Sequence, residues 1–505
     1  MRKLKIPLLL TAALAGIWIL ATVVENIRGK AAWDAFRTEW EAKGEVFDYR
    51  ALVPEPIPSE ENFAHTPLLK PHNDYLAARD AGRRPEAPRI VLAVDVECDE
   101  DMLLNLWGNW ESGHHLNLSV FQKSFREGTS WPHPEKAGKP AEDVLLALTI
   151  FDDELAELSN AAIERPRFRF DRNYEELLDV KAEHNGLTEM LFTHFRVIRA
   201  ATECYTLRAA ARLAAGNTEG AFADVKMSIF STDCLAAEPS MISQLARIGN
   251  MLRYPLQVVW EGLAGAKWND QQLASLEKLF GEINLLESYH WGMQGERIQG
   301  NFFIERLRNG AATDLDGNGI IDGKDDFWPW WYPSGWLYQN QLRLNQIHLN
   351  FSRRIIDSRA HLVKPGVAAE HKEYFEENKD ERYNLVANLL SLPIGIVANN
   401  FGTGQTRLDQ ARIACMLERH KIQKGKYPAS LSELGAALPT DPFSGKAYLY
   451  SLDPETVPGK RYRLRGVGPD QKDDREKPIP GEPDDLLWRY LPDPAIPDTS
   501  KPVEK

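Results

Sequence analysis

The amino-acid sequence predicts a mainly α-helical protein with a helical-hairpin body, a small α+β domain at its carboxyl end and one transmembrane helix at its amino end. Three observations predict this fold class. An uncharged apolar run of 19 residues lies near the start, apolar residues recur at three-and-four spacing between about 141 and 310, and short alternating segments follow residue 425. The length of 505 residues corresponds to about two to four domains.

The composition is that of a globular protein and argues against a nucleic-acid partner. There are 60 Lys and Arg residues against 73 Asp and Glu residues, a net charge of −13, and 43% of the residues are hydrophobic. Proteins that bind nucleic acid need clustered basic side chains to neutralise phosphates. We therefore expect no nucleic-acid partner, and the ordinary hydrophobic share excludes a wholly disordered chain.

The uncharged run from Ile6 to Val24 is long enough to be a membrane anchor. A helix of this length crosses the roughly 30 Å hydrocarbon core of a bilayer at about 1.5 Å per residue. A cleavable signal peptide is the alternative, but its apolar region is usually about 7 to 15 residues, and no small-x-small cleavage site precedes Glu25. Basic residues before the run favour a cytoplasmic amino terminus. We predict a cytoplasmic tail at 1–5, an anchor at 6–24 with the lipid bilayer as partner, and export of the remaining chain into the periplasm or envelope.

Residues 25–90 are expected to form a stalk followed by a strap. The segment Trp33 to Lys43 is typical of a helix that continues out of the membrane. Residues 50–90 contain seven prolines, which remove the backbone donors that regular structure needs. We therefore predict an extended, proline-rich strap across the body. Its expected apolar contacts are Phe63, Leu68 and Leu69.

Residues 91–310 are predicted to be a helical body. Leu187 to Ala215 carries apolar residues on one helix face, Gly216-Asn217-Thr218 breaks the pattern, and a second helix starts near Ala221. Later in the segment, Asp270 can cap a further helix. Residues 207–228 resemble one tetratricopeptide-type hairpin, but the pattern does not recur at a 34-residue period, so we predict hairpins rather than a repeat array.

Residues 341–404 are predicted to continue the helical body. Within them, Leu385 to Val397 is apolar but contains Pro393 and is too short to cross a bilayer, so we interpret it as a buried segment.

The four cysteines are too few for a disulfide scaffold. Cys204 and Cys234 would meet if their two helices form a hairpin, and an exported location would permit a disulfide between them. The alternative, which we favour, is that both are buried thiols.

The carboxyl-terminal part changes character. A helix from about Arg407 to Lys424 ends at Gly425, and Ser430 with Glu433 has the spacing of a capping box for a short helix. Tyr448 to Ser451 and Arg461 to Arg465 are typical of strands. We expect a proline-rich, disordered tail at 475–505. The tail residues that could dock are Leu486, Leu487 and Trp488.

Residues 314–325 have the spacing of a calcium-binding loop. Oxygen-bearing side chains occupy loop positions 1, 3, 5, 9 and 12, and Gly319 lies at the sixth position, where the chain must turn sharply. The loop resembles the EF-hand and especially the dockerin calcium loop, in which the twelfth residue is often Asp. The resemblance implies a structural calcium ion as cofactor. Its ligands would be Asp314, Asp316, Asn318, the carbonyl of Ile320, Asp322 and Asp325.

The calcium loop belongs to a segment, 311–340, that is also rich in tryptophan. Six aromatic residues lie between Trp328 and Tyr338. Aromatic platforms bind sugar rings or partner proteins, so a protein or glycan partner is one interpretation. The other, which we favour, is that the segment packs against the helical body.

Residues 405–474 carry a second resemblance. The stretch GKYPASLSELGAALPTDPFSGKAYLY, followed by YRLRGVGPDQKDD, resembles the globular part of the type II secretion major pseudopilin. The resemblance implies a long helix, a Tyr-Pro loop, an Asp-Pro-Phe turn, a small sheet and a calcium loop. It makes Asp470, Asp473 and Asp474 candidate ligands of a weaker second calcium site. The cleavage motif that opens a pseudopilin is absent, so assembly into a pseudopilus is not expected. The whole layout is similar to a class of exported, single-pass bacterial membrane proteins.

Common enzyme motifs are absent from the sequence. It contains no His-Glu-x-x-His zinc motif, no Gly-x-Ser-x-Gly elbow and no phosphate loop. We therefore predict a membrane-anchored, exported, non-enzymatic scaffold or secretion-associated protein. The alternative is a cell-envelope hydrolase that acts on polysaccharide, with paired carboxylates from the acidic stretch Asp95 to Asp101.

Overall fold

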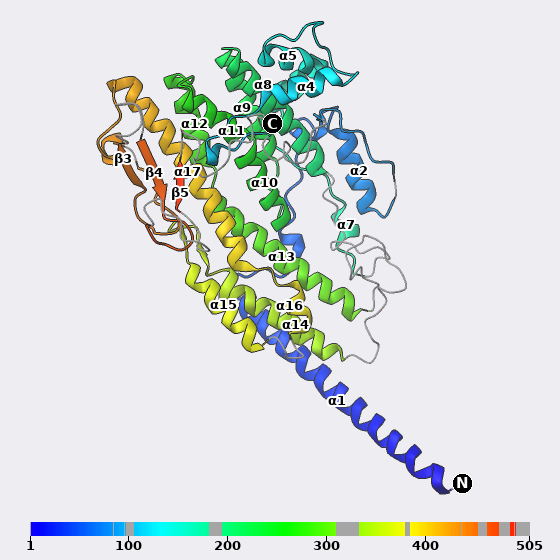
Figure 1. Ribbon diagram of the computed structural model, residues 1–505. Coiled ribbons are helices and arrows are strands. Elements are labelled where there is room, and N and C mark those ends of the chain that lie inside the picture. The colour runs from blue at the N-terminus through cyan, green and yellow to red at the C-terminus, as the bar shows by residue number, and fades with distance from the viewer. Residues whose placement is uncertain are drawn as a thin grey trace, which may run out of the picture.

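The protein consists of a long amino-terminal helix, a helical body and a small sheet (Figure 1). This arrangement, seen in a computed structural model, confirms the predicted mainly helical fold with a small antiparallel sheet near the carboxyl end. The described residues are 2–83, 85–94, 96, 106–180, 194–309, 333–378, 384–435, 437–452, 462–473, 485–488 and 490.

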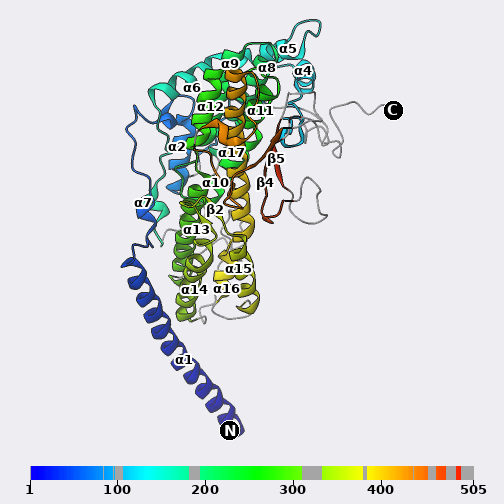
Figure 2. The ribbon, with the colours of Figure 1, turned by 90° about the vertical axis from the view of Figure 1, so that its left-hand side faces the viewer.

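Helix α1, Arg2–Glu41, is one uninterrupted helix of 40 residues, which confirms that the stalk continues the apolar run. Large apolar side chains on its first half are exposed, Leu14 and Leu20 among them, whereas Trp33 on its second half is buried. Figure 2 shows the first half extending past the end of the body where α14 and α16 lie. Exposed apolar side chains over this length make α1 a candidate membrane span.

A second helical stretch of the described chain, Leu385–Lys424, is also long and apolar enough to span a membrane. It is interrupted before Pro393, so that it comprises α16, Leu385–Leu390, and α17, Ile394–Lys424. Phe401 and Leu408 on α17 are completely buried. We therefore interpret α17 as a core helix of the body.

The prediction that Leu385 to Val397 is buried is wrong for one face of the segment. Leu385, Leu389 and Ile396 are exposed, whereas Val386 and Ile394 are buried. Helix α16 packs on α14, Ser334–Ile347, through backbone N–H groups of Val386 and Ala387 that donate to the side chain of Asn340. A two-turn helix on a surface can bury one face only.

Helix α1 crosses α14 at a point where both helices have glycine. A Cβ atom added to Gly29 would lie 2.3 Å from the carbonyl oxygen of Gly335, and one added to Gly335 would lie 2.2 Å from the carbonyl oxygen of Glu25. The backbone N–H of Gly335 donates to the side chain of Asn26 at 2.7 Å. Only glycine permits this approach, and the backbones of the two helices are therefore in direct contact.

The body is built from helices that pack side by side around a hydrophobic core (Figures 1 and 2). Besides α14, α16 and α17 they are α2 Lys70–Asp80, α4 Leu118–Glu127, α5 Pro140–Ala147, α6 Asp152–Glu164, α7 Tyr174–Leu177, α8 His194–Ala214, α9 Thr218–Asp233, α10 Met241–Arg253, α11 Pro255–Ala264, α12 Asp270–Glu282, α13 Leu285–Arg308 and α15 Pro365–Asn378.

Helices α8 and α9 form the predicted hairpin, and Asn217 caps α9. Their interface contains a buried ion pair in which the Arg208 guanidinium donates twice to the carboxylate of Asp224. Both Cys204 and Cys234 are buried free thiols, which confirms the interpretation we favoured. Burial raises the pKa of Cys204 to about 12, so this thiol is unreactive near neutral pH.

The extended strap predicted for residues 50–90 is wrong in part. The segment contains the helix α2 and the short 3₁₀ turns Tyr49–Ala51 and Phe63–His65. Pro71 lies in the first turn of α2, where a helix does not need the missing N–H donor. Phe63 and Leu69 are buried, so the predicted apolar contacts with the body are present.

Two predicted helix caps are also wrong. Asn269, not Asp270, caps α12, and it forms a full capping box with Gln272. Asp270 instead accepts hydrogen bonds from Arg419 and Gln423 on α17. The Ser430 side chain makes no capping hydrogen bond, and the short helix is a 3₁₀ turn, Leu431–Leu434. Neighbouring polar residues compete for one cap position, and the sequence does not decide which of them wins.

The carboxyl-terminal strands form one antiparallel sheet in the order β3, β4, β5. Strand β3 is Leu449–Leu452, β4 is Tyr462–Gly466 and β5 is Leu486–Trp488, with Leu452 opposite Tyr462 and Leu464 opposite Trp488. Strand β5 shows that part of the predicted tail docks. The side chain of Gln410 on α17 donates to the carbonyls of Leu464 and Leu486, which fixes the sheet to the helix.

Replacement of Gly335 by valine is expected to open the crossing between α1 and α14, because a Cβ atom there would overlap the backbone of α1. Overpacking of this kind costs about 1 to 3 kcal/mol. Hydrogen exchange of the full chain in detergent should show faster exchange of the α14 amides in Gly335→Val. The control is Gly16→Val, because Gly16 has open space around its Cβ position. Equal exchange in the two variants would contradict the contact.

Candidate functional site

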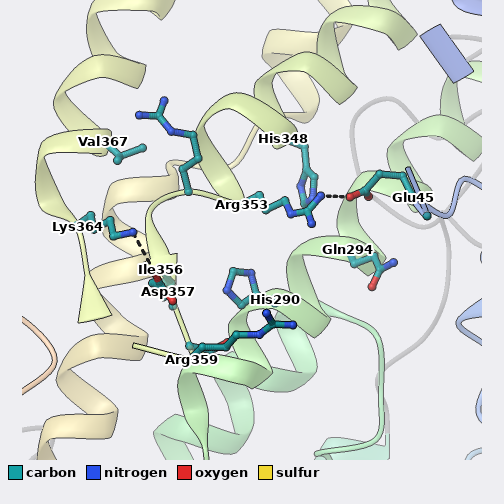
Figure 3. A pocket seen from close by; sticks show the side chains of 13 residues that line it. Glu45, His290, Gln294, His348, Arg353, Ile356, Asp357, Arg359, Lys364 and Val367 are labelled. Atoms are coloured by element: carbon teal, nitrogen blue, oxygen red, sulfur yellow. Dashed lines mark hydrogen bonds and ion pairs between the residues drawn. The ribbon is translucent and has the colours of Figure 1, made fainter. Parts of the chain in front are cut away.

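A polar cavity of about 600 Å³ lies where the chain leaves α1 and enters the body. Its walls come from Gly44 and Glu45, from α13, from a π-helical turn at His348–Ser352, and from the hairpin of β1, Ile356–Asp357, and β2, Leu362–Val363. Figure 3 shows His290 and Arg359 on one side of the cavity and His348 and Arg353 on the other. Four separate parts of the chain thus converge on one site.

The backbone around the cavity is irregular where its side chains enter. The π-helical turn continues α14 and widens it by one residue per turn, which turns His348 and Arg353 toward the same space. In the β1–β2 hairpin, His361 has a φ of 53°, in the left-handed region that non-glycine residues rarely adopt. The side chain of His361 is held by Asp409 at 2.9 Å. Irregular backbone of both kinds is frequent at functional sites.

Glu45 connects the segment after α1 to the cavity. One of its carboxylate oxygens pairs with Arg353, and the other lies 3.3 Å from the guanidinium of Arg297. Arg297 also donates to the carbonyl of Val46 at 2.6 Å and to the side chain of Asn345 at 3.0 Å. One buried guanidinium on α13 thus binds both the chain leaving α1 and helix α14.

Burial changes the pKa of Arg297. The side chain is almost completely enclosed, and burial lowers its pKa to about 10. The guanidinium therefore stays charged at neutral pH. The adjacent Glu45 carboxylate opposes the effect of burial and stabilises the charged form.

The cavity carries a surplus of positive charge. Its cationic side chains are Arg353, Arg354, Arg359 and Lys364, and its anionic side chains are Glu45 and Asp357. Lys364 lies 3.2 Å from Asp357, and Arg354 pairs at 3.0 Å with Glu370, which lies outside the lining. Arg359 has no ion-pair partner among the residues that the structure describes. A negatively charged group is the natural occupant of such a space.

The two histidines of the cavity are neutral near pH 7. Burial lowers the pKa of His348 well below its usual value, and the nearby positive charges of Arg297 and Arg353 lower it further. Burial also lowers the pKa of His290. The Nδ1 atom of His348 is buried and makes no hydrogen bond to any residue that the structure describes. Neutral imidazoles can donate one hydrogen bond and accept another.

The described lining offers several kinds of group to a ligand. It contains cationic side chains, the two neutral histidines and the hydroxyl of Ser358. The arrangement can therefore hold a ligand through charge and hydrogen bonds. Elsewhere in the body, His194 lies 2.7 Å from Glu238; the histidine side chain is buried, and the carboxylate is partly exposed.

The predicted calcium loop and most of the tryptophan-rich segment lie outside the described residues. The calcium ligands concerned are Asp314, Asp316, Asn318, Ile320, Asp322 and Asp325. Two described aromatic residues of the segment pack against neighbouring helices. The ring of Trp336 meets that of Trp18 on α1 edge to face at 6.3 Å, and the guanidinium of Arg308 lies 4.2 Å above the ring of Tyr338. These two contacts favour the packing interpretation for this part of the segment.

The structure describes two of the three residues predicted to form the weaker second calcium site. Asp473 accepts a hydrogen bond from Arg465 at 2.9 Å, and Asp470 accepts one from the backbone of Lys472, whereas Asp474 lies outside the described residues. The described part of the chain contains no group of three or more His, Cys, Asp or Glu side chains placed to bind a metal. The second calcium site stays a prediction.

The alternative prediction, a hydrolase, relies on the acidic stretch Asp95 to Asp101. Of this stretch the structure describes only Val96, and the next described residue after it is 106. No pattern in the sequence predicts the cationic cavity. The charged side chains of the cavity are spread over the sequence from Glu45 to Lys364, and they do not form a known sequence motif. The only local signal is the density of basic residues between Arg353 and Lys364.

No model of a known protein family matches this chain, and neither the curated proteins nor the solved structures include a similar one.

Replacement of His348 by glutamine is expected to reduce the acid sensitivity of the fold. The folded protein keeps His348 neutral, whereas an unfolded histidine takes up a proton below a pH of about 6.5. The unfolded state therefore binds more protons as the pH falls, and stability decreases from pH 7.5 toward pH 5.5. Denaturant unfolding of the full chain in detergent should show a smaller decrease in His348→Gln than in the wild type. The exposed His133, changed to glutamine, is the control, and equal pH dependence in both variants would contradict the assignment.

Proposed function

We propose that this protein is a membrane-anchored, exported, non-enzymatic scaffold associated with secretion. In this proposal α1 crosses the bilayer with its amino terminus in the cytoplasm, and the body lies in the periplasm or envelope. The observation that carries the proposal is the division of α1 into an exposed apolar half and a half that packs into the body. One helix thus serves as the anchor and as a structural element of the body.

The packing of α1 supports a scaffold role because it limits the motion of the body relative to the membrane. A body attached by a flexible linker would turn freely, since such linkers behave as random coils. Here the glycine contact with α14, the buried Trp33 and the ion pairs of Glu45 hold α1 at several points along its second half. The body therefore presents a defined face to partners at the membrane surface.

The carboxyl-terminal part supports the association with secretion. The long helix α17 is followed by the Tyr427-Pro428 loop, a turn at 441–446 and the antiparallel sheet, in the order that the likeness to pseudopilins implies. The carboxylate of Asp441 closes the turn by accepting from the backbone of Phe443 and from the hydroxyl of Ser444. Buried contacts of this kind fix the sheet as a surface for protein partners. We propose that it contacts the secretion machinery without entering a pseudopilus.

The proposal includes a structural calcium ion at residues 314–325 and a protein or glycan partner at the tryptophan-rich segment. The nearest described residues on either side of the predicted calcium loop are Asn309, after α13, and Pro333, before α14. The start of α14 contacts α1 at Gly29, only a few residues after the apolar run. A partner bound there would therefore lie near the membrane surface.

The anchor and the export are tested together in a bacterial host that makes the full chain. We expect the protein to remain in the membrane pellet after alkaline carbonate treatment and to keep its amino terminus, because α1 is uncleaved. Protease added to spheroplasts should digest the body. A mature chain that is soluble and begins near residue 25 would overturn the anchor, and a body protected from protease until the cells are lysed would overturn the export.

Calcium is expected to bind the full chain in detergent and to raise its thermal stability. A ligand at a hundred times its dissociation constant stabilises a fold by about 2.7 kcal/mol. Magnesium should substitute poorly, because it requires a smaller and stricter octahedral site. Calorimetric titration should show saturable uptake that is lost in the double variant Asp314→Ala with Asp325→Ala. The exposed Asp74, changed to alanine, is the control, and uptake that persists in the double variant would mean that the loop holds no calcium.

A further inference from the structure

We propose that the cavity beside Glu45 binds a water-soluble, dianionic oxyanion, of which a phosphate monoester is the representative. The inference depends on the geometry of the cavity, and its assignment to a soluble ligand also rests on the proposed membrane span of α1. It does not depend on the role in secretion, so the binding experiment can succeed if the protein has another partner.

The charge of the cavity selects an anion. The chain as a whole has a net charge of −13, yet four cationic and two anionic side chains line this one space. Arg297 behind the wall, and Glu370 and Glu287 outside it, are further charges nearby, and the lining itself has a surplus of two positive charges. A dianion neutralises this surplus, whereas a neutral ligand would leave it in place.

One charged group of the lining is available to a ligand, and one buried polar atom lies beside the cavity without a partner that the structure describes. Arg359 is exposed and has no ion-pair partner in the described chain. The ring of His348 is more than nine-tenths buried, and its Nδ1 atom lacks a hydrogen-bond partner among the described residues. That atom is itself closed off from solvent, so Arg359 and the net charge of the lining are the features that favour a ligand.

The arrangement of the donors suits a phosphate group. Figure 3 shows Arg353 with His348 across the cavity from Arg359 with His290, so that donors face the space from two sides. Guanidinium groups bind phosphate and carboxylate oxygens in pairs through parallel N–H bonds. The volume of about 600 Å³ exceeds that of a bare phosphate ion and lies within the range of roughly 300 to 1,000 Å³ found for small-molecule sites. The ligand therefore carries an organic part as well.

The position of the cavity excludes a lipid headgroup in the bilayer as the source of the anion. From Val24 to the end of α1 at Glu41 the helix rises about 25 Å at 1.5 Å per residue. The headgroup layer on each side of a bilayer is only about 5 to 8 Å thick. Even a strongly tilted α1 keeps the cavity well above that layer. The ligand must then come from solution.

The test uses the full chain in detergent, with inorganic phosphate and phenyl phosphate as probes and acetate as the monoanionic comparison. Calorimetry should show saturable binding of phenyl phosphate, weaker binding of phosphate and none of acetate. Arg359→Gln should weaken the binding of phenyl phosphate about tenfold or more, because a charge-assisted pair of hydrogen bonds is lost. Arg359 is exposed and outside any described ion pair, so this variant should fold normally, and circular dichroism checks that it does.

The matched control is Arg83→Gln, which removes the same charge from an exposed position outside the cavity. The proposal is overturned if no probe binds the wild type saturably at millimolar concentration, or if Arg359→Gln and Arg83→Gln bind phenyl phosphate equally well. In a further arm, the chain is reconstituted in nanodiscs of phosphatidylglycerol. Binding of that lipid that depends on Arg359, without binding of phenyl phosphate, would overturn the assignment of a soluble ligand.

Discussion

The rest of the structure depends on the contact between the backbones of α1 and α14 at Gly29 and Gly335. Helices that carry larger side chains at their crossing stay about 8 to 10 Å apart, and only small residues allow a closer approach. This approach lets the N–H of Gly335 reach the side chain of Asn26 on α1. The second half of α1 thereby becomes part of the body, although its first half is apolar and exposed.

The same contact determines what the chain does after α1 ends. Because α1 runs along α14, the segment that follows the end of α1 lies against the body. Glu45 in this segment pairs with the buried guanidinium of Arg297 and with Arg353. A buried arginine that loses its carboxylate partner is strongly destabilising, so Glu45 cannot leave without a compensating anion. The cationic cavity is thus formed jointly by the segment that follows α1 and by the body. Helix α1 and the cavity are parts of one packing arrangement, and this explains why the cavity lies where the chain leaves α1.

The sequence predicted the elements that repeat one signal over many residues. The length of the run Ile6 to Val24 predicted α1, and apolar spacing predicted α8 and α9, because both signals accumulate over several turns. Short elements were missed. The strands β1 and β2 have two residues each, which is too short for alternation to be recognised, and Pro71 indicated a break although it lies in the first turn of α2.

The candidate site could not be predicted for a different reason. Glu45 lies far from His290 and Arg359 in the sequence, and only the packing of α1, α13 and the β1–β2 hairpin brings the three together. Ionisable residues in such a chain are usually solvated, so the sequence gives no sign that these ones converge. The predicted calcium loop is the opposite case, since all of its expected ligands lie within 12 residues and their spacing alone is the basis of the prediction.

The central claim is that α1 and the body move as one unit, and a distance measurement between them tests it most directly. Spin labels at Glu39 on α1 and Glu373 on α15, both exposed, would be introduced into a Cys98→Ser background, because the other three cysteines are buried. Double electron–electron resonance on the full chain in nanodiscs should give one narrow distance distribution, and Gly335→Val should broaden it. A broad distribution in the unmodified background would show that the body is merely tethered to α1, and would contradict the account.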